Sequence, residues 1–96
     1  MSESIDFVKA QSKLENLLAQ CKTTLCSEAV EEVQHYIDNN EPEIAFEGLF
    51  IELMQLEKLP EGVSKEDCIS FGKYLKLAED SVLDDEFWEN FTKFMT

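Results

Sequence analysis

The chain has 96 residues, 44% of them hydrophobic, which suffices for one domain with one modest core. Its 21 acidic residues against eight lysines, with no arginine, give a formal net charge of −13. This charge repels phosphate and argues against direct binding to nucleic acid or to an anionic membrane surface, and no apolar run approaches the roughly 20 residues that span a bilayer.

Glycine (three) and proline (two) are scarce, and apolar residues recur every three or four positions, which predicts helices. The first predicted helix begins at a Ser2 or Ser4 cap and ends near residues 22–24. Its expected buried stripe comprises Ile5, Val8, Leu14, Leu17, Leu18 and Cys21.

The second predicted helix runs from a Ser27 cap to about Asn39, where Asn39 and Asn40 suit a left-handed stop. Its apolar residues fall on one side and its charged residues on the other. The apolar side comprises Ala29, Val30, Val33, Tyr36 and Ile37. The charged side comprises Glu31, Glu32, His35 and Asp38.

The third predicted helix runs from Pro42 to about Lys58 and is apolar on two sides. The expected core stripe comprises Ala45, Phe46, Leu49, Leu53 and Leu56. The nearly opposite side comprises Ile44, Gly48, Ile51 and Gln55. A helix with two apolar sides either lies at the centre of a bundle or faces a partner, and the pattern favours the central position without excluding the other.

Residues 59–62 interrupt the helical pattern. Ser64 then caps a predicted fourth helix, which is expected to bury Cys68, Phe71, Leu75 and Ala78. A turn at residues 81–84 leads to a last helix, with Asp84 as its cap. The apolar side of this helix comprises Phe87, Trp88, Phe91, Phe94 and Met95. The predicted fold class is therefore all-α: a single helical domain, residues 1–96, built as a compact bundle of about five helices.

The sequence lacks catalytic and metal-binding patterns. His35 is the only histidine, and no nucleophile stands at helical spacing from it. Cys21, Cys26 and Cys68 lack the further ligands of a tetrahedral zinc site, and an odd number of cysteines does not suit a disulfide framework. The first residues resemble no signal peptide. We therefore expect a cytoplasmic protein that is not an enzyme and binds no cofactor and no metal.

Charge is distributed unevenly along the chain. Residues 27–57 hold nine acids and no lysine, and residues 79–89 hold six acids and no lysine. The eight lysines fall mainly on the predicted first and fourth helices. Such a field attracts a basic protein, although an acidic surface also keeps many proteins soluble whatever their function.

The segment from Val33 to Leu59, VQHYIDNNEPEIAFEGLFIELMQLEKL, resembles small immunity proteins of bacterial toxin systems. A helix ending in Asp/Asn, followed by Asn-Glu-Pro-Glu and Ile-Ala-Phe-Glu-Gly-Leu, is similar to the immunity proteins of contact-dependent growth inhibition (CdiI) and of the Maf polymorphic toxins (MafI). The resemblance covers about a third of the chain. It implies neutralisation of a cognate toxin, which in these systems is often a nuclease, with EndoU-type ribonucleases as frequent partners.

We therefore expect a basic protein as partner, most of all the C-terminal nuclease domain of a cognate toxin. The chain is expected to bind this domain stoichiometrically, through acids that take the place of RNA phosphates. The expected interface is the exposed side of the second and third helices, with two isoleucines as apolar anchors. It comprises Glu31, Glu32, Asp38, Glu41, Glu43, Ile44, Glu47, Ile51 and Glu52. The alternative is an acidic helical adaptor or regulatory subunit that binds a basic protein of the cell's own machinery. An enzyme is the least expected class.

Overall fold

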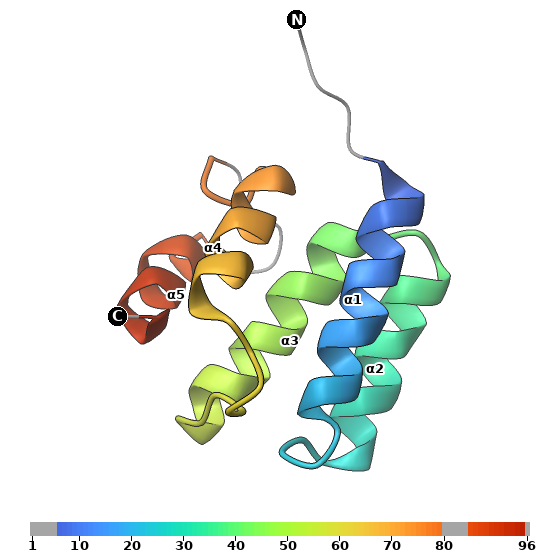
Figure 1. Ribbon diagram of the computed structural model, residues 1–96, viewed down its shortest axis with the longest axis horizontal. Helices are drawn as coiled ribbons and strands as arrows, with labels where there is room; N and C mark the ends of the chain where they lie inside the picture. The colour runs from blue at the N-terminus through green and yellow to red at the C-terminus, as the bar shows by residue number, and fades with distance from the viewer. Residues whose placement is uncertain (1–5, 80–84, 96) are drawn as a thin grey trace, which may run out of the picture.

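The computed structural model describes residues 6–79 and 85–95, and these residues form five helices and no strand, which confirms the all-α prediction. The helices are α1 (Phe7–Cys21), α2 (Ser27–Asp38), α3 (Pro42–Leu56), α4 (Lys65–Tyr74) and α5 (Phe87–Met95). α3 runs diagonally through the middle, with α1 and α2 on one side and α4 and α5 on the other (Figure 1). α3 packs against α1, α2 and α5, so the central position favoured by its two apolar sides is confirmed.

Side-chain caps fix the first residues of two helices. The Asp6 carboxylate accepts hydrogen bonds from the backbone N–H groups of Val8 and Lys9 at 3.1 and 3.2 Å, so α1 is capped later in the chain than predicted. Val8 is 78% exposed and is therefore not part of the buried stripe. Ser64 caps α4 as predicted, by accepting from the N–H of Asp67.

The remaining predicted helix caps are either wrong or lie outside the described residues. Cys26, rather than Ser27, occupies the cap position of α2, and its side chain makes no capping hydrogen bond. The predicted caps at Ser2, Ser4 and Asp84, the buried position of Ile5 and the turn at 81–84 lie outside the described residues.

Left-handed residues end α2 and α3. Asn40 has a φ of 57° and ends α2 as predicted. Glu57 has a φ of 53°, and the N–H of Lys58 donates to the carbonyl of Leu53, which is the hydrogen bond of a Schellman stop. α3 therefore ends two residues earlier than predicted, and Leu56 is 46% exposed instead of buried.

The core on the α4–α5 side is a cluster of phenylalanines. The Phe46 ring lies 4.7–6.4 Å, centroid to centroid, from four others. The cluster comprises Phe46, Phe50, Phe71, Phe87 and Phe91, all of them buried. Burying each ring contributes roughly 1.5–3 kcal/mol, so α5 is held although it has only nine residues.

α4 also ends earlier than the sequence predicts. The helix stops at Tyr74, and Lys76 takes a left-handed conformation with a φ of 66°. Leu77 is consequently buried, whereas Ala78, which was expected in the core, is exposed.

Candidate functional site

The outward face of α2 carries three of the seven acids that were expected at the interface. Ala29, Val33 and Ile37 are buried against α1 and α3, and this inner stripe turns the remaining positions to solvent. We define the acidic face as Glu28, Glu31, Glu32 and Asp38 of α2 together with Glu41 of the α2–α3 turn, all of which are exposed. The predicted exposure of Glu31, Glu32, Asp38 and Glu41 is confirmed.

The charges of the acidic face are not neutralised from within. Among residues 6–79 and 85–95, no ion pair involves any of its carboxylates. Asp38 accepts one hydrogen bond from the neutral amide of Gln34, at 2.9 Å. Since like charges on one face repel one another, a positively charged partner lowers the electrostatic energy of this face.

α3 does not present the exposed side that the sequence suggested. None of its positions from 42 to 54 is exposed, because α1 and α2 cover one side of the helix and α5 packs on another. Glu47 is fully buried, so its predicted place on an exposed interface is wrong. The other predicted interface residues of this helix, Glu43, Ile44, Ile51 and Glu52, are half-buried.

Glu43 combines partial burial with an unsatisfied oxygen. Its Oε1 atom is sealed from solvent and has no hydrogen-bond donor in the described part of the chain. A buried carboxylate oxygen without a donor raises the free energy of the folded state by about 1–3 kcal/mol.

An apolar side chain lies beside this acidic region. Phe7, at the start of α1, is 47% exposed and lies against Ile37, Asn40 and Pro42 at the α2–α3 turn. Figure 1 shows the first turn of α1 next to this connection. We call Phe7, Asp38, Glu41 and Glu43 the turn surface. Phe7 is not among the residues predicted from the sequence, because its position at the α2–α3 turn depends on how the helices pack.

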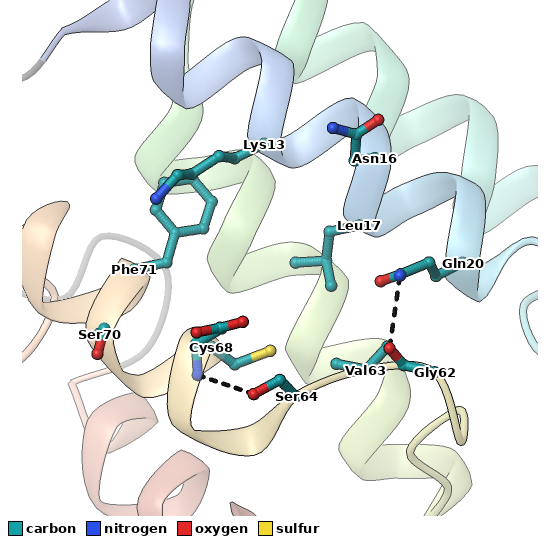
Figure 2. Close-up of a pocket in the computed structure, with 11 residues that line it drawn as sticks. Lys13, Asn16, Leu17, Gln20, Gly62, Val63, Ser64, Cys68, Ser70 and Phe71 are labelled. Atoms are coloured by element: carbon teal, nitrogen blue, oxygen red, sulfur yellow. Dashed lines mark hydrogen bonds between the residues drawn. The ribbon is translucent and has the colours of Figure 1, made fainter.

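A cleft lies between α1 and α4 (Figure 2). This cleft has a volume of about 360 Å³. Its walls come from α1, from the connection before α4 and from α4 itself. It is lined by Lys13, Asn16, Leu17, Gln20, Gly62, Val63, Ser64, Asp67, Cys68, Ser70 and Phe71.

The two buried cysteines are poor candidates for nucleophilic chemistry. Burial raises the pKa of Cys21 to about 11. Burial, with further contributions from Cys21 and Asp67, raises the pKa of Cys68 to about 12. Both thiols are therefore protonated near neutral pH. The thiolate, not the protonated thiol, acts as a nucleophile and as a metal ligand.

In the described segments no group of three His, Cys, Asp or Glu side chains is placed to hold a metal ion. No helix there has the length and hydropathy needed to cross a membrane. Comparisons of the chain with protein-family models, with curated proteins and with solved structures found no match.

Proposed function

We propose that this protein binds a basic protein through the turn surface and the acidic face, and that it is a cytoplasmic immunity protein that neutralises a nuclease toxin. One observation carries the proposal: exposed carboxylates without ion-pair partners lie in the same α2–α3 turn region against which an exposed aromatic side chain packs. Phe7 is 47% exposed, and the neighbouring acids Asp38 and Glu41 have no ion-pair partner among the described residues. Aromatic anchors combined with complementary charge are typical of high-affinity protein interfaces.

The partner chemistry follows from how nucleases bind RNA. A nuclease needs a basic cleft for the phosphates of its substrate. Carboxylates held on a rigid helix can occupy such a cleft in place of the phosphates and so exclude the substrate. Opposite charges can raise the association rate from about 10⁵–10⁶ M⁻¹s⁻¹ to about 10⁸ M⁻¹s⁻¹ or more at low salt, while a buried anchor such as Phe7 slows dissociation.

Two further observations support this function. The segment that resembles immunity proteins, residues 33–59, includes Asp38, the α2–α3 turn and the first turn of α3. The half-buried Glu43 lies in that first turn of α3 and adds a further acid to this segment.

Co-expression tests the proposal. The gene of an immunity protein is expected directly after that of its toxin, so the C-terminal domain of the adjacent toxin is the partner to use. We expect the wild-type chain to restore growth to cells that express this domain and to co-purify with it in equimolar amount. Phe7→Ala together with Asp38→Asn and Glu41→Gln should reduce or abolish this protection.

The matched control replaces Val8 by Ala together with Glu15→Gln and Glu79→Gln. It removes one exposed apolar side chain and two exposed charges outside the turn surface. Growth inhibition that persists with the wild-type chain would refute the immunity function and leave the alternative, an adaptor for a basic protein of the cell's own machinery. Equal protection by both triple variants would refute the turn surface as the interface.

A further inference from the structure

The cleft between α1 and α4 is a built feature of the fold. α1 packs closely on α2 and α3 but not on α4. At one end, the backbone N–H of Asp6 donates to the Tyr74 hydroxyl at 2.7 Å. At the other end, the Gln20 side-chain amide donates to the Gly62 carbonyl at 3.4 Å. The two helices are thus tied together at both ends and held apart between them.

The floor of the cleft is apolar and close to solvent. Figure 2 shows Leu17 pointing from α1 toward the opposite wall, where Val63, Cys68 and Phe71 lie. Each of these four side chains is buried but retains 4–8% exposure, whereas the other four phenylalanines of the core cluster are fully buried. A ligand that covered them would remove apolar surface from water, which favours binding.

The polar lining is neutral overall. Lys13 is the one cation and Asp67 the one anion, so their formal charges cancel. The Lys13 ammonium lies 5.5 Å from the centre of the Phe71 ring, where a cation–π interaction holds it. The remaining polar side chains are two carboxamides, Asn16 and Gln20, and two hydroxyls, Ser64 and Ser70. On a chain with a net charge of −13, a cleft without net charge is suited to an uncharged ligand.

We propose that this cleft binds a short, uncharged segment of extended polypeptide that carries one aliphatic side chain. Carboxamides donate and accept hydrogen bonds, as the main chain does, and Gln20 already donates to a main-chain carbonyl across the cleft. The volume of about 360 Å³ lies at the small end of the range for ligand sites and accommodates one aliphatic side chain with its flanking peptide groups.

The probe for this site is N-acetyl-leucine N-methylamide, an uncharged single residue with both peptide groups. It is titrated into ¹⁵N-labelled full-length protein while the amide signals are recorded by NMR. We expect saturable shifts of the signals of Leu17, Gly62, Val63 and Phe71, with a dissociation constant in the millimolar range. N-acetyl-glycine N-methylamide should bind about ten-fold more weakly, because it lacks the side chain that covers the floor.

A double variant tests the carboxamides. Asn16→Ala with Gln20→Ala should weaken binding of the leucine probe about ten-fold through the loss of two hydrogen bonds. The control, Gln55→Ala with Asn90→Ala, removes two equally exposed amides outside the cleft and should leave the affinity unchanged. Both pairs are exposed, so the variants should retain the fold.

Three results would overturn the proposal. The first is a set of shifts that do not saturate or that fall outside the cleft. The second is equal affinity of the wild type and the Asn16/Gln20 double variant. The third is equal or tighter binding of N-acetyl-leucine, whose carboxylate would then identify Lys13 as part of an anion site. None of these results bears on the toxin-binding surface, because the two sites share no residue.

Discussion

The two sides of α3 are packed differently. On one side, the 15-residue α1 and the 12-residue α2 pack through aliphatic stripes. On the other side, α4 and α5 are shorter, with ten and nine residues, and are held by aromatic rings. The longer pair buries Leu14, Leu18, Val33 and Ile37 along three to four turns. This continuous inner stripe leaves the whole outer face of α2 free to carry charge.

The shorter pair depends on fewer and closer contacts. Gly72 of α4 lies so near Trp88 of α5 that an added Cβ would stand 2.6 Å from Cζ3 of the indole ring. α4 therefore packs closely on α5 and not on α1, and the cleft lies between α4 and α1. The two candidate sites thus arise from two modes of packing: the aliphatic side leaves an exposed face for charge, and the aromatic side leaves a cleft beside it.

Gly72→Ala is expected to have the largest effect on stability, because it disturbs the packing of α4 on α5. The added methyl group must displace the Trp88 ring, and overpacking of this kind costs about 2–3 kcal/mol. Urea unfolding followed by circular dichroism measures the loss. In Gly62→Ala, the control, the nearest atom to the new methyl group is 4.0 Å away, so its stability should change by less than about 0.5 kcal/mol. Equal stability of the two variants would contradict the close α4–α5 contact.

Alkaline pH probes the cleft floor through Cys68. Its folded-state pKa of about 12 is above the ordinary value of 9.0, so the unfolded chain loses this proton first. The stability that this thiol confers is complete below pH 9 and is lost as pH rises from 9 toward 12. When the pH is raised from 8 to 11, the free energy of unfolding of Cys68→Ala should fall by roughly 2 kcal/mol less than that of the wild type.

Cys26→Ala is the control for this titration, because Cys26 is exposed. Its stability should fall with pH in parallel with that of the wild type. If Cys68→Ala also followed the wild type, the Cys68 thiol would not be desolvated in the folded protein.

The sequence predicts those parts of the fold that local chemistry decides. The serine cap at Ser64, the asparagine stop at Asn40 and the buried stripe through Phe87, Phe91 and Met95 follow from propensity and helical spacing alone. The early stop at Glu57 could not be predicted in this way, because the residue adopts a left-handed conformation without being glycine or asparagine.

The candidate sites were only partly predictable, because they depend on how the helices pack. An acid on a helix is ordinarily exposed, yet Glu47 is buried since α3 is covered by other helices. Phe7 became a candidate only when its contact with the α2–α3 turn was known. The cleft joins Leu17 to Phe71 across 54 positions of sequence, and no local pattern contains that relation.

The central claim is that the acids of α2 and the α2–α3 turn attract a basic partner. The most direct test is the association rate with the toxin domain that we propose as the partner, measured by stopped flow as a function of salt concentration. Glu31→Gln with Asp38→Asn and Glu41→Gln should lower the rate at low salt about ten-fold and flatten its salt dependence. Glu15→Gln with Glu66→Gln and Glu79→Gln changes the net charge equally and should have a much smaller effect. Identical salt dependence of the two triple variants would show that only net charge matters and would contradict the claim.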